Sequence, residues 1–299
     1  MTLRIGTRRS ALALAQAEEV RHLLGEHGVT AELVPMSTSG DEGMRWSEAP
    51  GGLKGLFVDT IVEALERAEI DVAVHSAKDL PADDEDGFEI AAVPPRADPA
   101  DVLVLREPSL PAGAVIGTSS LRRRAQLLRA FPGVTVDDLR GNVDTRLRKV
   151  ADGEVDAAVL ASAGLTRLGV APAHAAPLGF DVMVPAPGQG SLALQTREDD
   201  LATQTALAAI DHAPSHLALD AERSLMWRLG GGCSLPLGAI ATVDGSRIEL
   251  LAVVASPDGS ELVRVEVVSD STEGAAAAAT KELIAGGAEE ILASLDDGS

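Results

Sequence analysis

The chain has 299 residues, 45% of them hydrophobic, and its 46 acidic and 25 basic residues give a formal net charge of −21. This length predicts two or three domains, since a single hydrophobic core stops growing near this size. The acidic balance argues against a binder of nucleic acid or acidic membranes, which needs a basic face, and no apolar run reaches the roughly 18 residues of a membrane span. We therefore expect a small-molecule ligand, with no nucleic acid and no membrane as partner.

The first 185 residues or so alternate strand-like and helix-like segments, which is typical of an α/β fold with largely parallel strands. Strands are expected at 2–7, 30–36, 70–76, 101–105, 114–120, 135–142 and 155–164, and helices at 10–28, 57–69, 121–131 and 145–152.

Two pairs of segments echo one another. RIGTRRSALALAQ (4–16) is similar to VIGTSSLRRRAQ (115–126), and EIDVAVHSA (69–77) is similar to EVDAAVLAS (154–162). The general likeness of all βα units would explain this. The sharper interpretation is two similar α/β domains facing a cleft, where ligands gather beyond the carboxyl ends of the strands.

The C-terminal part has a different pattern. A helix at 217–232 precedes three strands at 236–243, 248–255 and 261–268, with turns at Asp244-Gly245 and Asp258-Gly259, and one closing helix is expected over 273–295. The predicted fold is two doubly wound α/β domains of the periplasmic-binding-protein type, plus a small α+β domain with an antiparallel three-stranded sheet. The expected boundaries are 1–95 with 190–209, 98–187, and 213–299.

Arginines recur at the predicted strand ends. GTSSLRRR places Thr118, Ser119 and Ser120 at a helix N-terminus, which favours an anion, and Arg122 and Arg123 follow in the first turn. The alternative is simple helix capping with solvated arginines.

Similar turns carry further arginines and a capping serine, namely Arg8, Ser10, Arg140, Arg146 and Arg167. Singly, each arginine would be a surface charge. Their recurrence in a chain this acidic predicts a ligand with several carboxylates or phosphates.

Two further segments carry chemistry. HSAKDLP sets Ser76, Lys78 and Asp79 at the end of a buried strand, where Asp79 is either a plain ion-pair partner or a proton-transfer and cation-stabilising group. GGLKGLF with Lys54 is either a mobile flap or a surface loop, and APGQGS is a hinge or a surface loop.

GGGCSLP holds the only cysteine, Cys233. One cysteine excludes an internal disulfide and a zinc site built from several cysteines, and a reducing, cytoplasmic location follows most simply. His212 and His216 have metal-ligand spacing but no completing ligand, so we expect no metal. Without a partner histidine in sequence, the thiol is best suited to covalent anchoring.

These motifs, in order, resemble the porphobilinogen deaminase (hydroxymethylbilane synthase) family over about residues 4–240: GTRRSALAL, KGLF, HSAKDLP, IGTSSLRRR, LRGNVDTRL, PGQG and GGGCSLPLG. The resemblance implies a cytoplasmic, monomeric transferase of tetrapyrrole (heme) biosynthesis. It would join four porphobilinogen molecules head to tail, release ammonia each time, and free linear hydroxymethylbilane by hydrolysis.

The resemblance also implies the roles of single residues. A dipyrromethane cofactor would be attached by thioether to Cys233, and Asp79 would contact pyrrole nitrogens, assist loss of the amine and stabilise an azafulvene-type cation. The other cofactor-binding residues would be Ser76, Lys78, Thr118, Ser119, Ser120, Arg122, Arg123 and Arg146. Incoming substrate and the growing chain would contact Arg8, Ser10, Arg140, Arg146 and Arg167, with Lys54 on the active-site loop.

Three positions depart from the family pattern: Leu53 within GGLKG, Asp144 where glycine is common, and Arg9 where glutamine is frequent. The first two leave loop motion and the rate of chain elongation open. Two other functions stay open at this point, a catalytically inert anion-binding module and a thiol-dependent hydrolase. A binding module has no evident use for a presented thiol, so Cys233 favours the transferase.

Overall fold

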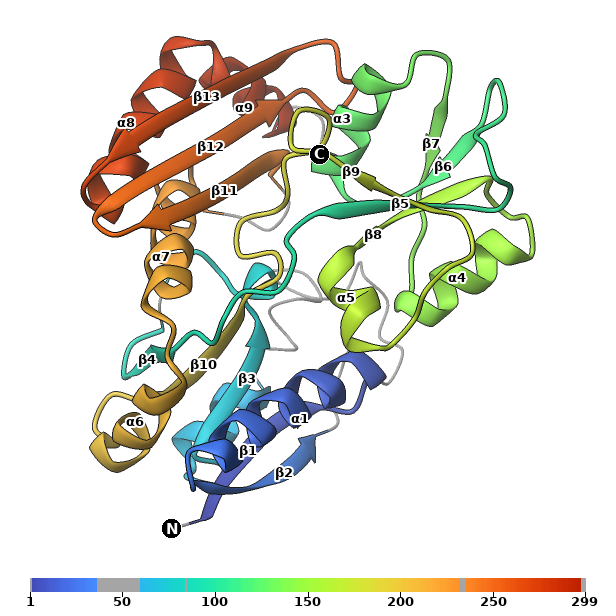
Figure 1. Cartoon of the computed structure of the whole chain (residues 1–299). Helices are drawn as coiled ribbons and strands as arrows, with labels where there is room; N and C mark the ends of the chain where they lie inside the picture. The colour runs from blue at the N-terminus through green and yellow to red at the C-terminus, as the bar shows by residue number, and fades with distance from the viewer. Residues whose placement is uncertain (1, 37–59, 84, 232–234, 297–299) are drawn as a thin grey trace. The chain divides into compact units, whose positions relative to one another are not determined.

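The described residues of the chain are built around three β-sheets. The computed structural model of the chain describes residues 2–36, 60–83, 85–231 and 235–296 (Figure 1). Two sheets have five strands each, and the third has three antiparallel strands. By contacts the chain divides into two compact units: Met1–Arg96 with Ser191–His216 forms the first, and Ala97–Gly190 with Leu217–Ser299 forms the second.

The first unit holds a sheet with the strand order β2-β1-β3-β10-β4. Strands β1, β2 and β3 are parallel, whereas β10 is antiparallel to both of its neighbours, β3 and β4. The strands are β1 (Thr2–Arg8), β2 (Thr30–Met36), β3 (Val72–Ser76), β4 (Phe88–Ala92) and β10 (Leu192–Arg197). The helical segments are α1 (Ala11–Glu26), a helix over 60–66, η2 (Ala77–Asp79), α6 (Leu201–Leu207) and η3 (Ala208–Ile210).

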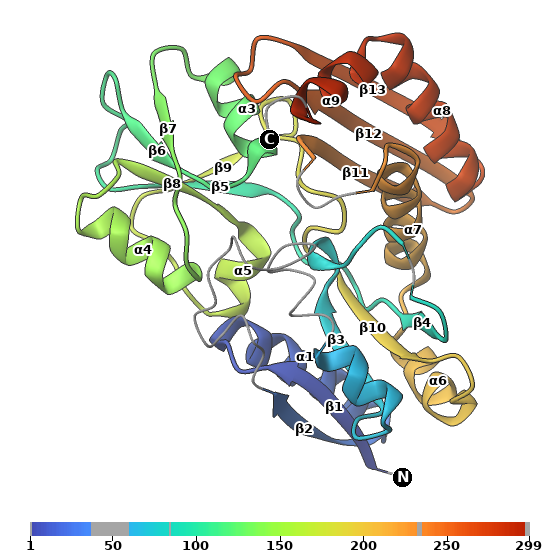
Figure 2. The ribbon, with the colours of Figure 1, turned by 180° about the vertical axis from the view of Figure 1, so that it is seen from behind.

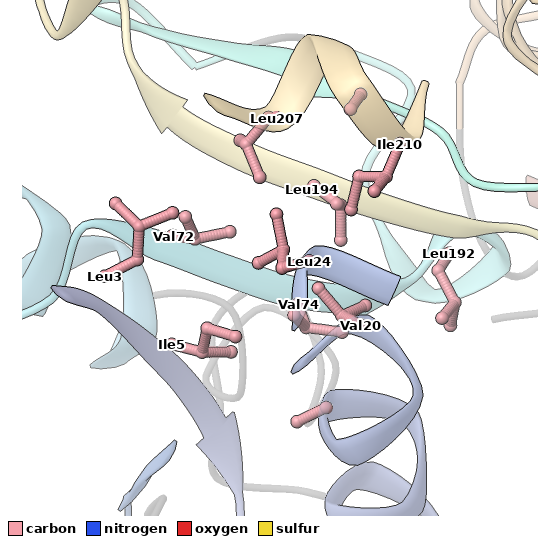
Figure 3. Close-up of a cluster of buried hydrophobic side chains, with 12 residues drawn as sticks. Leu3, Ile5, Val20, Leu24, Val72, Val74, Leu192, Leu194, Leu207 and Ile210 are labelled. Carbon is pink, nitrogen blue, oxygen red and sulfur yellow. The ribbon is translucent and has the colours of Figure 1, made fainter. Parts of the chain in front are cut away.

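Helix α1 covers one face of this sheet because its apolar residues share one side. Val20 and Leu24 are fully buried and belong to one cluster with Leu3, Ile5 and Val72 of the strands (Figure 3). Each such side chain contributes about 1.5–3 kcal/mol by leaving water. The helix begins after Ser10, whose hydroxyl accepts a hydrogen bond from the Ala13 N–H at 3.3 Å, and this cap fixes where the turn after β1 ends.

The second unit repeats this topology in the order β7-β6-β8-β5-β9. Here β6, β7 and β8 are parallel, and β5 is antiparallel to both β8 and β9. The strands are β5 (Asp101–Leu105), β6 (Val115–Gly117), β7 (Thr135–Asp137), β8 (Ala157–Ala161) and β9 (Ala175–Leu178), and the helices are α3 (Leu121–Ala130), α4 (Val143–Ala151) and α5 (Ser162–Arg167).

The two echoes in the sequence therefore correspond to equivalent elements. In both sheets the first echo forms the strand and helix β1–α1 or β6–α3, and the second forms the parallel neighbour β3 or β8. The prediction of two similar α/β sheets is confirmed. Each sheet is mixed, because one internal strand enters it in the opposite direction.

The three-stranded sheet also belongs to the second unit. It consists of β11 (Leu237–Asp244), β12 (Arg247–Ala255) and β13 (Leu262–Ser269), with α7 (Ala213–Arg228) preceding it. Helices α8 (Thr272–Ala285) and α9 (Ala288–Asp296) cover one face of the sheet (Figure 2). The prediction of one closing helix is wrong, since Gly286 and Gly287 separate α8 from α9 and Gly287 has φ +99°, which lies in the left-handed region that ends helices.

Within the second unit the three-stranded sheet contacts the segment that follows β9, and also helix α3. Val184, Ile240 and Val253 form a buried cluster, and the Ala239 N–H donates to the Pro185 carbonyl at 2.9 Å. The turn after β12 lies against α3 (Figures 1 and 2), where a Cβ on Gly259 would stand 2.6 Å from the Ala125 carbonyl oxygen.

The predicted boundaries of three domains stay a prediction. In the part of the chain that the structure describes, no helix combines the length and the hydropathy needed to cross a bilayer.

Candidate active site

In the first unit, two strand ends carry predicted site residues. Arg8 is the last residue of β1, and Ser10 caps α1 with its side chain. Thr7, which precedes Arg8, is fully buried and donates its hydroxyl to the Ala13 carbonyl at 3.0 Å. The turn from β1 into α1 is therefore held by side chains at both ends, and the half-buried Arg8 has a fixed backbone.

The neighbouring strand β3 ends in the second set. Its last residue is Ser76, and Lys78 and Asp79 lie in the single 3-10 turn η2 that follows. The turn is fixed on β10 by a hydrogen bond from the Ala77 N–H to the Ser191 carbonyl at 3.1 Å. Both Lys78 and Asp79 are half-buried, so they stand at the edge of the sheet and not in its core.

Gln16, which sequence reasoning missed, connects these two strand ends. Its side-chain amide donates to the Ser76 hydroxyl at 2.6 Å, and only 6% of Gln16 is exposed. A polar residue on the buried face of α1 was the available signal, since a buried amide needs partners.

In the second unit, the equivalent strand end is β6, followed by Thr118, Ser119 and Ser120. Ser120 caps α3 by accepting from the Arg123 N–H, and Ser119 donates its hydroxyl to the Leu139 carbonyl at 2.8 Å. Gly117 packs so closely that a Cβ there would be 2.6 Å from a methyl carbon of Leu139. This glycine brings the start of α3 next to the loop at 138–141.

Arg122 and Arg123 are buried at the start of α3, with 4% and 6% of each residue exposed. Both guanidinium groups bind the carboxylate of Asp101, itself 0% exposed: Arg122 Nη1 donates to Oδ2 at 2.8 Å, and Arg123 Nη2 donates to Oδ1 at 2.7 Å. Asp101 was not among the predicted site residues. An acid opening the otherwise apolar strand DVLVL was the sequence signal, because buried charges are paired.

The charge state of this cluster is fixed. Burial alone would raise the pKa of Asp101, but the charges of Arg122 and Arg123 and their hydrogen bonds hold it well below its usual range. Burial lowers the pKa of Arg122, yet a guanidinium starts so high that it stays protonated. The cluster therefore contains two positive charges and one negative charge.

The remaining predicted arginines lie on other loops of the second unit. Arg140 is exposed and donates from Nε to Asp138 at 2.6 Å, and a hydrogen bond from Ser119 together with the Arg140 charge lowers the pKa of Asp138. Arg146 donates from Nε to the Gly141 carbonyl at 2.9 Å. Arg167, the last residue of α5, donates to the Gly190 carbonyl at 3.2 Å.

Two predicted residues, Cys233 and Lys54, lie outside the described residues, as does Leu53. A further buried acid, Glu222 of α7, was missed by sequence reasoning. Its carboxylate accepts from the Gly188 N–H at 2.6 Å and from the Ala241 N–H at 2.7 Å, so it links the PGQG segment to β11.

Comparison with known proteins identifies the family. The model for "Porphobilinogen deaminase, dipyromethane cofactor binding domain" matches residues 3–205, and that for "Porphobilinogen deaminase, C-terminal domain" matches residues 216–285. The porphobilinogen deaminase of Acidithiobacillus ferrooxidans is 44% identical over 297 residues, which cover 97% of each chain. That of Syntrophotalea carbinolica is 44% identical over 302 residues, covering 98% of this chain and 96% of the relative.

Among solved structures, the methionine-binding protein MetQ is 15% identical, with a TM-score of 0.44 over 70% of this chain and 89% of that one. The family models and the full-length relatives agree with the ordered motifs of the sequence. The chain belongs to the porphobilinogen deaminase family, the hydroxymethylbilane synthases, and contains the dipyrromethane cofactor binding domain of that family.

Proposed function

We propose that the chain joins four porphobilinogen molecules head to tail, that Cys233 anchors the dipyrromethane cofactor, and that Asp79 is the acid/base and cation-stabilising residue. The observation that carries this proposal is the position of Asp79 in the turn after the central strand β3, in a chain that matches the family over both of its domain models. A carboxylate at such a strand end can face a ligand while its backbone stays fixed.

The residues of the second unit fit a group that bears several carboxylates. In the described part of the chain, Arg122 Nε is buried and has no hydrogen-bond partner. The two guanidiniums face a single acid, and Thr118, Ser119 and Ser120 offer hydroxyls and N–H groups at the start of α3. Cofactor carboxylates would be held by these residues and by Arg146. When bound, the dipyrromethane supplies the pyrrole carbon from which the chain is extended.

The first unit would supply the proton chemistry and contacts to substrate. Asp79, with Ser76 and Lys78, would take part in holding the cofactor as well. As the carbon–nitrogen bond of the substrate breaks and ammonia leaves with the electron pair, the Asp79 carboxylate would stabilise the positive charge left on the substrate ring. After the new carbon–carbon bond forms, Asp79 can accept the proton that the ring releases.

Substrate carboxylates would be bound by arginines. Arg8 and Ser10 of the first unit and Arg140, Arg146 and Arg167 of the second are the candidates, with Lys54 as a further cation. Porphobilinogen has two carboxylates, so each added ring brings two more negative charges that need partners. We further propose that the chain is cytoplasmic and monomeric. Gel filtration with light scattering would test the oligomeric state, and a monomer should give a single species with the mass of one chain.

The decisive experiment is the intact mass of the purified protein. The chain should be heavier than its sequence by one covalently attached dipyrromethane, and Cys233→Ser should remove that addition. Ser234→Ala, at the adjacent position, is the matched control and should keep it. An unmodified chain that still turns over porphobilinogen would contradict the assignment of Cys233.

Family membership favours this enzyme over an inert anion-binding module or a thiol-dependent hydrolase. The reaction products distinguish this enzyme from both alternatives. Ammonia and linear hydroxymethylbilane should form in the ratio of four to one.

A further inference from the structure

We propose that Asp101 is a positioning residue, which orients Arg122 and Arg123 of α3 as a preformed donor pair for ligand carboxylates. This inference rests on the proposed function, because it takes the ligand of α3 to be a carboxylate-bearing group. Asp101 is the first residue of β5 and is completely buried, so it acts on a ligand only through the two arginines.

The geometry explains why two adjacent arginines converge. Neighbouring residues on a helix point about 100° apart, so Arg122 and Arg123 need a common partner to lie together. Asp101 provides it with one oxygen for each guanidinium: Oδ2 accepts from Arg122 at 2.8 Å, and Oδ1 accepts from Arg123 Nη2 at 2.7 Å and Nε at 3.2 Å. The Arg123 contact is thus a fork that fixes the plane of its guanidinium.

Asp101 is itself held in place. Its backbone lies inside the sheet, opposite Ala161 of β8 and Leu178 of β9. The side-chain amide of Gln189 donates to Asp101 Oδ1 at 3.0 Å and to the Pro99 carbonyl at 2.7 Å. The orientation of the carboxylate is therefore set by the strand and by the PGQG segment.

Backbone carbonyls complete the fixation of the arginines. Arg122 Nη1 also donates to the Val184 carbonyl at 2.7 Å, and Arg123 Nη1 donates to the Val159 carbonyl at 2.9 Å. Within the described chain, Arg122 Nε remains buried without an acceptor. A buried donor left unpaired is unfavourable, so the cluster would gain from one more acceptor.

The charge balance points the same way. One carboxylate neutralises one of the two guanidiniums, which leaves one positive charge in excess. Without Asp101 the two like charges would repel each other in a site with little water. With it, the repulsion is relieved, and the excess charge favours an anion.

The test compares Asp101→Asn with Asp156→Asn. Asparagine keeps the shape and one acceptor oxygen but removes the charge. Asp156 also pairs with one arginine, Arg106 at 2.9 Å, and accepts from a backbone N–H, but it is partly exposed and belongs to another cluster.

For Asp101→Asn we expect a folded chain and a severalfold smaller fraction of chains carrying the covalent addition. The KM for porphobilinogen should rise about tenfold, which is the effect of losing one charge-assisted hydrogen bond. Asp156→Asn should change both values less than twofold.

A second measurement separates this inference from the proposed function. In the Cys233→Ser chain, which cannot carry the covalent cofactor, glutarate serves as a small dicarboxylate probe. It should raise the unfolding temperature, and it should raise it less when Asp101→Asn is added. An equal shift would overturn the positioning role, and a larger shift would show that Asp101 competes with the ligand. Absence of covalent addition and turnover in the unaltered chain would instead refute the proposed function.

If Asp101→Asn fails to fold, the positioning role of Asp101 can still be tested in the unaltered chain. Nuclear magnetic resonance of arginine Nε–H groups should show slow exchange with water at Arg123, whose Nε–H faces Asp101. Fast exchange there would overturn the inference.

Discussion

Gln16 donates a hydrogen bond to the hydroxyl of Ser76 across 2.6 Å, although 60 residues separate them in the chain. This contact links α1, which begins just after Arg8 and Ser10, to the strand end that carries Lys78 and Asp79. This partly buried bond adds to the pairing of β1 with β3 and helps to fix two sets of predicted site residues of the first unit relative to each other.

Gln16→Met should therefore weaken the first unit with little change in side-chain volume. The bond contributes about 1 kcal/mol, and Ser76→Ala should cost a similar amount. Because both variants remove the same bond, the double variant should cost less than their sum by about 1 kcal/mol. Urea unfolding of the four chains measures this coupling, and strict additivity would show that the bond contributes nothing.

Asp79→Asn should nearly abolish turnover while the chain stays folded. The amide keeps the shape of the carboxyl group but can neither accept a proton at neutral pH nor balance a positive charge on the substrate. Loss of a general acid–base group lowers the rate by about 10²–10⁴-fold. Ammonia release from porphobilinogen is the measurement. The nearby exposed Asp83 provides the control, Asp83→Asn, and substantial activity of Asp79→Asn would remove Asp79 from the chemistry.

Stability of the first unit should depend on pH through Asp71. Burial would raise the pKa of this carboxyl, but hydrogen bonds from the Arg4 side chain and N–H, with the charges of Arg4 and Arg197, hold it below its usual range. A carboxyl whose pKa is lower in the folded than in the unfolded chain stabilises the fold above its ordinary pKa of about 4, and this contribution is lost as the pH falls through the folded pKa.

Accordingly, Asp71→Asn should lower the free energy of unfolding by about 1–3 kcal/mol at pH 7. The difference from the unaltered chain should shrink as the pH is lowered below about 4. Urea unfolding at pH 7, 4 and 3 measures it. Glu63→Gln breaks an exposed pair with Arg67 and should change stability by less than about 1 kcal/mol. A difference for Asp71→Asn that persists undiminished at pH 3 would refute the linkage.

Gly259→Ala should destabilise the second unit more than Gly245→Ala. Both glycines lie in turns of the three-stranded sheet with left-handed φ, +73° and +60°, so alanine costs about 1–2 kcal/mol at either position. Only at Gly259 would the new Cβ also meet α3, 2.6 Å from the Ala125 carbonyl oxygen, whereas nothing lies within 4 Å at Gly245. The extra overlap should add about 1–3 kcal/mol. Equal unfolding temperatures of the two variants would show that the turn does not press on α3.

The sequence patterns predicted local elements and their repetition well. The likeness of RIGTRRS to VIGTSSLRR correctly paired β1–α1 with β6–α3. A strand, a capping serine and an amphipathic helix can each be recognised from residues that are close together in the sequence. The direction of β5 and β10 was not predicted. Each pairs with strands distant in sequence, such as Leu194 with Val74, and periodicity within one strand contains no information about its partner.

The candidate site was predicted by residue type, but its contacts were not. Arg122 and Arg123 were recognised as arginines at a helix start. Their burial and their ion pairs with Asp101 could not be predicted, because the three residues come together only through tertiary packing. Gly286 and Gly287 are a local signal for the end of a helix, and the structure does divide the helix there. The sequence prediction gave more weight to the long run of good helix formers around them and therefore missed the break.

Strand β10 lies between β3 and β4 in the first sheet, yet its residues follow all five strands of the second sheet in the chain. During synthesis the ribosome delivers residues 101–178 before residues 192–197, and the chain emerges at about 5–20 residues per second. The second five-stranded sheet can therefore close while the first still has a gap between β3 and β4, with the edges of both strands unpaired. The first unit can be completed only after the residues of the second five-stranded sheet have been made. In a chain truncated before residue 192, the unpaired edges of β3 and β4 would favour aggregation.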